Sequence, residues 1–332
     1  MSTVVETNAD IVPRLEAAAE RVQRAHKMAA NVIFGQDIVI ERTILTILSG
    51  GHALLIGVPG LAKTLLVDTL GKVLGLDAKR IQFTPDLMPS DIIGSEVLED
   101  EPGRARSFRF IKGPIFTQLL MADEINRASP KTQSALLQAM QEHHVTVAGQ
   151  RHDTPAPFHV LATQNPLEQE GTYPLPEAQL DRFLLQIDVD YPDLIAERKM
   201  LYATTGTDKA KIEAVLTAQD LMATQRLVRQ IPVPDKVVEA ILKLVRSARP
   251  GTGISAETDK YVAWGPGPRA SQALMLAVRA KALIDGRLAP SVDDVVNLAE
   301  PILKHRMALS FAARTEGQDL AKIIARLAAA VE

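Results

Sequence analysis

The feature that most constrains this 332-residue chain is the stretch Gly57-Val58-Pro59-Gly60-Leu61-Ala62-Lys63-Thr64. It lies between an apolar run at 53–56 and an amphipathic run at 65–74. A strand, a glycine-containing turn and a Lys-Thr pair that opens a helix form a cradle of backbone N–H groups for phosphate oxygens. Lys63 would then contact the β- and γ-phosphates of a nucleotide, and the Thr64 hydroxyl would bind Mg²⁺. The alternative is an ordinary Gly/Pro turn followed by an incidental Lys-Thr pair.

Ala62 departs from the general pattern, because it stands where the last glycine of a phosphate loop is expected. The position opens a helix, so alanine is acceptable there if the backbone angles are helical and the methyl group clears the phosphates. The stretch alone therefore favours nucleotide binding, and the rest of the chain must supply the groups for chemistry.

Composition narrows the class of protein. The chain has no cysteine, which excludes disulfides and thiolate metal sites and fits a reducing compartment. Residues 1–10 have neither a basic nor an apolar segment of a signal peptide, and no apolar run approaches the roughly 20 residues of a membrane span. We expect a cytoplasmic protein. A net charge of −3, only 4% aromatic residues and no basic block do not favour nucleic-acid binding.

The order of hydrophobic patterns predicts two domains. Strand-like runs alternate with helical ones over 11–207, which predicts a three-layer α/β core, a parallel sheet with helices on both faces. Two segments interrupt this core, an insert at about 88–112 and a hairpin at about 143–156. Residues 208–332 carry helical patterns and no further strand pattern, so we expect a small all-α lid domain there. Residues 1–10 are expected to be disordered.

Polar residues follow two of the predicted core strands. Asp123 and Glu124 end the apolar run 115–122, and Asn165 follows the run 158–163. Ligands of open parallel sheets bind at the carboxyl ends of strands, so these residues should lie beside the phosphate loop. Asp123 suits Mg²⁺ binding and Glu124 suits polarising a water that attacks the γ-phosphate, while Asn165 can orient that water. Helix-capping acids and a turn-forming Asn before Pro166 are the structural alternatives.

Three arginines are further candidates. Arg182 precedes the last predicted core strand and could stabilise charge on the γ-phosphate of a neighbouring subunit, or could pair with Asp181 or Glu177 in its own chain. Arg269 begins a helix of the second domain, from where it could reach the γ-phosphate or serve as a plain helix-start residue. Arg127 lies just past the two acids and could act on a neighbour, or be an ordinary surface residue.

Four segments in this order resemble the MoxR family of AAA+ ATPases, over roughly residues 15–310. They are residues 57–64, Ala122-Asp123-Glu124-Ile125-Asn126-Arg127-Ala128, Ala162-Thr163-Gln164-Asn165-Pro166 and Leu175-Pro176-Glu177-Ala178-Gln179-Leu180-Asp181-Arg182-Phe183. That family carries alanine at the position of Ala62, so the departure supports the resemblance. Relatives often have Ser before the Pro-Arg pair that contains Arg269, whereas this chain has Gly267.

The resemblance implies a role for each candidate. Lys63 and Thr64 are Walker A residues, Asp123 and Glu124 Walker B residues, and Asn165 is sensor 1. Arg182 matches the arginine finger that acts on a neighbouring subunit, and Arg269 the sensor 2 arginine. The cofactors are ATP and Mg²⁺, with Mg²⁺ held by Thr64 and Asp123. The implied ATP-binding set is Gln36, Gly57, Val58, Pro59, Gly60, Leu61, Ala62, Lys63, Thr64, Leu65 and Asp123.

The resemblance also implies a biological setting. We expect a homo-oligomer, a hexameric ring, that couples ATP hydrolysis to chaperone-like remodelling, activation or metal insertion in a protein client, with a partner that bears a von Willebrand factor A (VWA) domain. The insert at 88–112 and the hairpin at 143–156 would face the pore or the client. Two alternatives are a ring ATPase that remodels nucleic acid, and a scaffold that assembles on ATP with little turnover.

Overall fold

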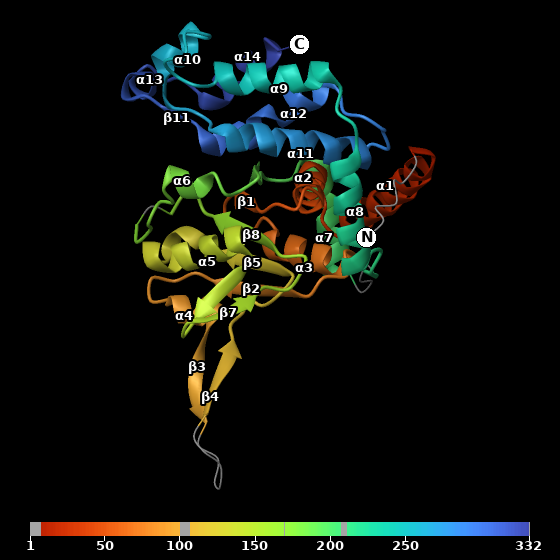
Figure 1. The fold of residues 1–332 in the computed structure, drawn as a ribbon, viewed down its shortest axis with the longest axis vertical. Coiled ribbons are helices and arrows are strands. Elements are labelled where there is room, and N and C mark those ends of the chain that lie inside the picture. Colours follow the sequence, from red (N-terminus) through yellow and green to blue (C-terminus); the bar gives the residue numbers. More distant parts are fainter. Residues whose placement is uncertain (1–7, 100–106, 169, 207–210, 332) are drawn as a thin grey trace, which may run out of the picture.

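A five-stranded parallel sheet forms the centre of the computed structural model, which describes residues 8–99, 107–168, 170–206 and 211–331 (Figure 1). The strands are β1 (Ala53–Ile56), β2 (Ala78–Gln82), β5 (Leu119–Asp123), β8 (His159–Gln164) and β9 (Leu185–Asp188). Their order across the sheet is β2-β5-β8-β1-β9. The predicted parallel α/β core is confirmed, and the carboxyl ends of β1, β5 and β8 meet at one edge.

Alternate side chains of each strand enter two different apolar layers, because successive residues of a strand point to opposite faces. Leu55 and Met121 pack with α1 (Asn8–Ala30), α2 (Asp37–Leu48) and α3 (Lys63–Val73). Leu54 and Leu120 pack on the other face, against α5 (Pro130–Glu142) and α4 (Pro89–Ile93). The sheet is therefore covered on both faces, as the sequence predicts. Residues 1–7, part of the segment expected to be disordered, lie outside the described residues, and α1 begins at Asn8.

Two antiparallel hairpins leave the α/β core. The strands β3 (Gly94–Glu99) and β4 (Ser107–Lys112) form a long hairpin that projects away from the body of the molecule (Figure 1). The strands β6 (His144–Val147) and β7 (Gln150–Asp153) form a shorter one. These hairpins fall in the predicted insert and hairpin segments, and the tip of the first, residues 100–106, lies outside the described residues.

The C-terminal part is mostly helical, with α8 (Ala218–Gln230), α9 (Asp235–Ser247), α10 (Ala256–Tyr261), α11 (Pro268–Ile284), α12 (Val292–Leu303), α13 (Phe311–Thr315) and α14 (Leu320–Ala329). It also contains a small antiparallel pair, β10 (Val262–Trp264) with β11 (Ala308–Leu309), so the expectation of no further strand is wrong. Strands of two and three residues are too short to give an alternating pattern. A single apolar core contains residues of α8, α9, α11, α12 and α14 together with residues of α1, α2 and α3.

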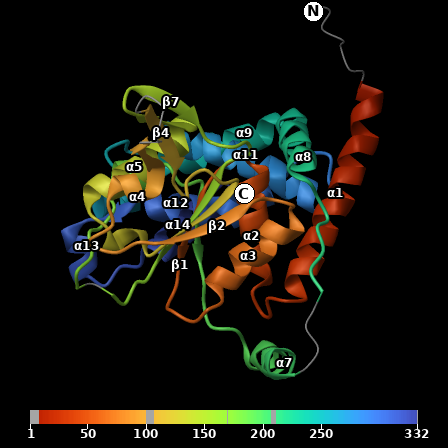
Figure 2. The ribbon, with the colours of Figure 1, turned by 90° about the horizontal axis from the view of Figure 1, so that it is seen from below.

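The connection between the two parts starts with α7 (Leu194–Thr205), which stands off the body of the molecule (Figure 2). The chain then returns along the end of α3, where the N–H groups of Val215 and Leu216 donate to the carbonyl of Val73 at 2.8 and 3.2 Å. Gly75 allows this approach, because a Cβ there would lie 2.3 Å from the carbonyl oxygen of Leu216. The start of the helical part is thereby bound to α3. Across the described ranges, no helix is long and apolar enough to cross a membrane.

Candidate active site

A cavity of about 760 Å³ lies at the carboxyl ends of β1, β5 and β8. The strand order places β1 beside β8 and β8 beside β5, so residues that follow these strands reach the same space. The cavity gathers most of the candidates that the sequence singled out, and its lining includes Gln36, Pro59, Gly60, Leu61, Ala62, Lys63, Thr64, Leu65, Asp123, Glu124 and Asn165. Gly57 and Val58 line an adjacent cavity on the other side of the loop.

The phosphate loop has the backbone that its glycines allow. At Gly57 a Cβ would lie 2.5 Å from the carbonyl oxygen of Val189, so the neighbouring chain excludes a side chain. Gly60 has φ +85°. Ala62 has φ 57° and ψ 21°, in the left-handed region, so the condition of right-handed helical angles under which alanine would be acceptable is not met. An alanine there costs roughly 1–2 kcal/mol relative to the right-handed conformation. The helix α3 starts one residue later, at Lys63.

Lys63 is folded over the loop that it follows. Its ammonium group donates to the carbonyl of Gly57 and, at 3.3 Å, to that of Val58. Partial burial lowers the pKa of the Lys63 ammonium, and the negative charges of Asp123 and Glu124 act in the opposite direction. The ammonium therefore lies within the field of both acids, at the place where a bound phosphate would offer it a stronger acceptor.

Asp123 is held by two side chains that the sequence analysis missed. The hydroxyl of Thr163 donates to one carboxylate oxygen at 2.5 Å. The guanidinium of Arg80 donates to the other oxygen at 2.6 and 3.2 Å. Thr163 follows Ala162 on β8 and Arg80 lies on β2, the two strands on either side of β5. A polar residue near the end of each neighbouring strand was the available signal, but using it requires the strand order.

Glu124 has an unusual backbone, with φ 55° and ψ 50°. Its N–H donates to the Thr163 hydroxyl at 2.9 Å, which ties the residue to β8. One oxygen of its carboxylate accepts hydrogen bonds from Gln82 at 2.9 Å and from Arg127 at 3.1 Å. Left-handed non-glycine residues are concentrated at functional sites, where surrounding contacts maintain the strain. Arg127, which also approaches Glu168 at 3.6 Å, has partners in its own chain.

Asn165 forms the turn that one of its two sequence interpretations expects, and it also lines the cavity. Its carbonyl oxygen accepts a hydrogen bond from the N–H of Leu167 at 3.1 Å, which is a turn around Pro166. The residue is 5% exposed and lines the cavity with Lys63 and Glu124. Because the oxygen is used by the turn, the amide NH₂ is the group left to act as a donor toward the cavity.

The far side of the cavity is largely apolar. It is formed by the turn after α1 and by the start and inner face of α7, with Val32, Ile33, Phe34, Tyr191, Pro192 and Met200 in the lining. Gln36 is buried beside it and donates to the carbonyl of Asp190 at 2.7 Å. An apolar slot next to a phosphate loop suits the flat base of a nucleotide. The sequence analysis found Gln36 and missed the residues of α7, because α7 is distant in the chain.

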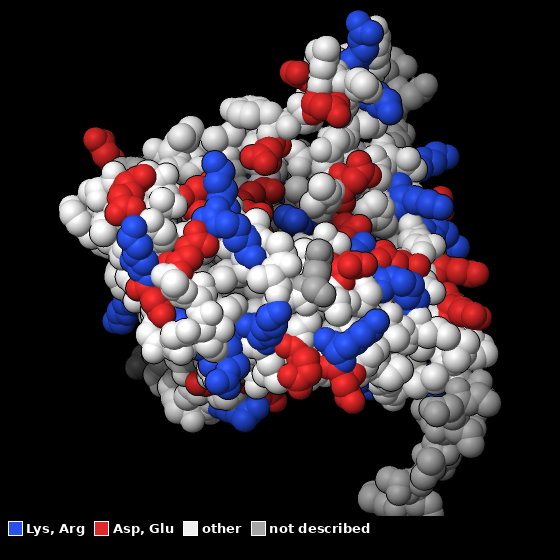
Figure 3. All heavy atoms as spheres, turned by 90° about the horizontal axis from the view of Figure 1, so that it is seen from above, with Lys and Arg blue, Asp and Glu red and all other residues white. Residues whose placement is uncertain are grey.

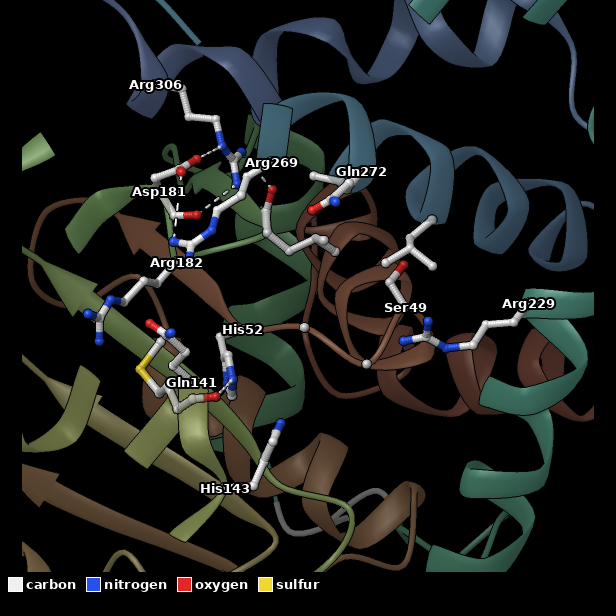
Figure 4. A pocket seen from close by; sticks show the side chains of 16 residues that line it. Ser49, His52, Gln141, His143, Asp181, Arg182, Arg229, Arg269, Gln272 and Arg306 are labelled. Carbon is white, nitrogen blue, oxygen red and sulfur yellow. Dashed lines mark hydrogen bonds and ion pairs between the residues drawn. The ribbon is translucent and has the colours of Figure 1, made fainter. Parts of the chain in front are cut away.

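The structure does not bring Arg182 and Arg269 into this cavity. They line a separate cavity of about 280 Å³, together with Asp181, Arg229 and Arg306 (Figure 4). Arg182 donates to the carbonyl of Leu137 at 2.6 Å, and its Nε has no partner among the described residues. Asp181 approaches Arg269 at 3.8 Å and Arg306 at 2.7 Å. Within the described ranges Arg182 forms no ion pair with Asp181 or Glu177, the alternative considered from the sequence.

The first cavity fits a magnesium nucleotide. Thr64 and Asp123 both line it. Mg²⁺ prefers oxygen ligands, and a site with few protein ligands leaves positions for the waters and nucleotide phosphates that complete its coordination. Lys63 and the loop residues 59–62 line the same space, together with the apolar residues of the slot. The donor set is therefore consistent with a nucleotide bound through its phosphates.

A phosphate loop after β1, two acids at the end of β5 and a helical lid together define a P-loop ATPase of the AAA+ class. Residues 52–185 match the sequence profile of the "ATPase family associated with various cellular activities (AAA)", and residues 254–327 match the "AAA lid domain". The chain belongs to the MoxR family of AAA+ ATPases. It is 42% identical to "Chaperone MoxR1" of Mycobacterium tuberculosis, over 90% of this chain and 78% of that protein.

Two further relatives cover most of their own length. The Bacillus subtilis protein YeaC is 40% identical over 97% of this chain and 96% of its own. "Protein MoxR" of Paracoccus denitrificans is 30% identical over 87% of this chain and 89% of its own. Among solved structures, a protein of Cytophaga hutchinsonii that is described as an ATPase superposes with a TM-score of 0.87 at 37% identity, over 95% of this chain and 96% of that one.

Proposed function

We propose that this protein hydrolyses ATP in a Mg²⁺-dependent reaction. The observation that carries the proposal is that one cavity contains Lys63, Asp123, Glu124 and Asn165 beside an apolar slot. Lys63 binds the β- and γ-phosphates, and Glu124 polarises the attacking water that the Asn165 amide orients. Thr64 and Asp123 hold Mg²⁺, which neutralises charge on the phosphates when bound. Gln36, residues 57–62 and Leu65 complete the nucleotide site.

Arg182 and Arg269 lie away from this cavity in their own subunit, which supports their acting on a nucleotide held by a neighbour. Arg182 has no carboxylate partner among the described residues, and both arginines line an open cavity. A cation delivered to the γ-phosphate by another subunit accelerates hydrolysis by about 10³–10⁵-fold in comparable systems. This arrangement requires a homo-oligomer, and we propose a hexameric ring. We thus propose that Arg269 acts from the neighbouring subunit, and that Arg127 does not, since it contacts Glu124 of its own chain.

We further propose a protein client, which the ring remodels, activates or supplies with a metal cofactor in the cytoplasm, together with a VWA-domain partner. The projecting β3–β4 hairpin exposes Val97, Leu98, Phe108 and Ile111, which suits contact with an apolar segment of a protein. The name of the relative "Chaperone MoxR1" agrees with this class of client. Basic and acidic side chains are interspersed on the face seen in Figure 3, which does not favour a nucleic-acid groove.

The Glu124→Gln variant tests the catalytic assignment. It keeps the size of the side chain and removes the negative charge, so we expect ATP binding within about twofold of wild type and hydrolysis reduced by about 10²–10⁴-fold. Binding is measured with a fluorescent nucleotide, and hydrolysis by phosphate release. Normal turnover in the variant would mean that Glu124 is not the group that polarises water.

The dependence of the rate on protein concentration separates the alternatives. A rate per subunit that rises cooperatively as subunits associate supports an active site completed by a neighbour. Flat, near-zero turnover at all concentrations would instead indicate an ATP-gated scaffold. Stimulation by DNA that falls steeply with salt would indicate a nucleic-acid remodeller. Capture of proteins by the Glu124→Gln variant in ATP, compared with the same variant without nucleotide, then identifies the client.

A further inference from the structure

Arg306 is a buried arginine that contacts the segment carrying Arg182. It follows α12, in the short helix η2 (Lys304–Arg306), and it is 2% exposed. Its Nε donates to the carboxylate of Asp181 at 2.7 Å, and its two terminal nitrogens donate to the carbonyls of Phe183 at 2.6 Å and Leu184 at 3.2 Å. A longer contact of 3.3 Å reaches the carbonyl of Asp181 itself.

These contacts involve the residues on both sides of Arg182 in the sequence. Asp181, Phe183 and Leu184 are all fixed by one guanidinium, so the backbone on both sides of Arg182 is held by a residue of the helical part. The guanidinium is in turn held by its own helix, through the carbonyl of Ile302 at 2.6 Å. A planar guanidinium with five donors in a fixed fork suits this task, whereas a lysine ammonium has three donors.

Asp181 connects the same cluster to Arg269. Its two carboxylate oxygens are divided between the arginines, with Oδ1 toward Arg306 at 2.7 Å and Oδ2 toward Arg269 at 3.8 Å (Figure 4). Burial lowers the pKa of the Arg306 guanidinium, the pairing with Asp181 raises it, and the nearby positive charge of Arg269 lowers it further. One carboxylate thus lies between two cations that would otherwise repel each other.

We propose that Arg306 and Asp181 are positioning residues that hold Arg182 and Arg269 as one unit for the γ-phosphate of the neighbouring subunit. The inference rests on the proposed function, in which both arginines act in trans. Arg306 fixes the backbone of Arg182, and Asp181 fixes the Arg269 side chain relative to that backbone. The position of the helical part therefore sets where the two cations are presented. Neither residue is among those that line the nucleotide cavity of its own subunit.

The Asp181→Asn variant tests this with little change in side-chain volume. We expect kcat for ATP to fall by about tenfold to a hundredfold, since small misplacements of catalytic groups have effects of this size. KM should stay within about twofold, because the nucleotide cavity of each subunit is unchanged, and ring size measured by sedimentation should be unchanged. Arg306→Lys keeps the charge and loses donors, and we expect the same separation of kcat from KM.

Mixing variants distinguishes positioning from general damage. A subunit with Asp181→Asn has an intact nucleotide cavity, and a subunit with Glu124→Gln has an intact arginine pair. When the two are mixed, we expect the rate per Asp181→Asn subunit to rise severalfold, because its nucleotide then faces a correctly held Arg182. A subunit that is merely misfolded gains nothing from such a neighbour, so absence of this recovery would overturn the inference.

Asp294→Asn is the matched control. Asp294 pairs with Arg287 at 2.7 and 2.8 Å and its side chain is 5% exposed, so the same change breaks another arginine pair, that of a buried aspartate. Arg287 lies beyond the C-terminal end of the 17-residue α11, about 25 Å from the Arg269 end. We expect a lower unfolding temperature and an unchanged kcat.

Comparing these variants with Arg182→Ala also separates failure of this inference from failure of the proposed function. If Arg182→Ala loses activity while Asp181→Asn and Arg306→Lys keep the wild-type kcat, the arginine acts in trans without these positioning residues, and the inference is wrong. If Arg182→Ala itself keeps the wild-type kcat, the trans arginine of the proposed function is wrong, and the inference fails with it.

Discussion

The Thr163 hydroxyl donates a hydrogen bond of 2.5 Å to the carboxylate of Asp123. The Thr163 hydroxyl oxygen also accepts a hydrogen bond from the N–H of Glu124 at 2.9 Å. One side chain of β8 therefore fixes both acids at the end of β5. The acid assigned to Mg²⁺ and the acid assigned to water are therefore positioned by a common neighbour. Mutations at Thr163 should affect both functions together.

Thr163→Val should lower kcat by about tenfold to a hundredfold, because the isosteric side chain neither donates to Asp123 nor accepts from Glu124. We expect a loss of stability of about 1–3 kcal/mol as well, since the N–H of Glu124 is left unpaired. Thr163→Ser retains the hydroxyl and serves as the control, with kcat close to wild type. Steady-state ATPase assays and urea unfolding measure the two effects, and a wild-type kcat in Thr163→Val would contradict the role of this side chain.

Arg80→Ala should lower the Mg²⁺ concentration needed for half-maximal ATPase activity. Arg80 occupies one oxygen of Asp123 at 2.6 Å and is about half exposed, so it competes with the metal for that carboxylate. An exposed pair of this kind is worth up to about 1 kcal/mol, which corresponds to a shift of up to about fivefold. Arg127→Ala is the control, since Arg127 contacts Glu124 and not Asp123. An increased Mg²⁺ requirement in Arg80→Ala would show that Arg80 supports the site.

Ala62→Gly should raise the free energy of unfolding by about 1 kcal/mol, because glycine removes the cost of the left-handed conformation at φ 57°. Ala148→Gly provides a comparison, as Ala148 has φ 47° in the exposed turn between β6 and β7. Both variants should be stabilised in urea unfolding, and only Ala62→Gly can alter ATP affinity. Destabilisation at position 62 alone would mean that the methyl group makes favourable contacts with the loop.

Stability should rise with pH between about pH 4 and 6.5, because burial lowers the pKa of three histidines, His52, His159 and His305. Burial lowers the pKa of His52 to about 3 and that of His159 to about 4, from 6.5. In this range the unfolded chain binds protons that the folded protein does not, so the contribution is complete above pH 6.5 and is lost as the pH falls. Burial is the main cause of the lowered pKa of His159, and the hydrogen bond of 2.8 Å that Nδ1 donates to the Gly51 carbonyl acts in the opposite direction. Nε2 accepts from the amide of Gln225 at 3.1 Å, which suits a neutral ring.

His159→Gln removes one of these titrations. We expect the slope of stability against pH to fall by up to about 1.4 kcal/mol per pH unit in that window, the limit for a single group. Chemical unfolding at a series of pH values measures the slope. His26, which is only partly buried, is the control position for His→Gln. An unchanged slope in His159→Gln would mean that this ring is protonated in the folded protein.

The sequence predicted the parallel core and the residues of the main cavity because these features are local. Lys63 and Thr64 follow an apolar strand, and Asp123 with Glu124 and then Asn165 follow two others, so the rule about strand ends was enough. The strand order was not available from the sequence, and it is this order that places Arg80 and Gln82 beside the acids. The left-handed backbone of Ala62 could not be predicted either, because alanine usually favours the right-handed helical conformation.

The surroundings of Arg182 illustrate a second limit. The sequence offered Asp181 as a partner for Arg182, because the two are adjacent. In the structure Asp181 pairs instead with Arg306, 125 positions later in the chain, and approaches Arg269. Choosing among competing cations requires the packing of the helical part on the core, which no pattern in the sequence describes.

The attachment of residues 215 and 216 to the end of α3 connects the phosphate loop to the helical part through one helix. The helix α3 begins at Lys63 and ends at Val73, whose carbonyl binds the two N–H groups of the connecting chain. The helix is thus a short rod of about 16 Å, with the nucleotide cavity at one end and the root of the helical part at the other. A movement of the loop that displaces this rod must also displace α8, whose opposite end carries Arg229 into the arginine cavity. In the proposed ring, each subunit would therefore transmit the occupancy of its own cavity to the arginine cavity that faces its neighbour.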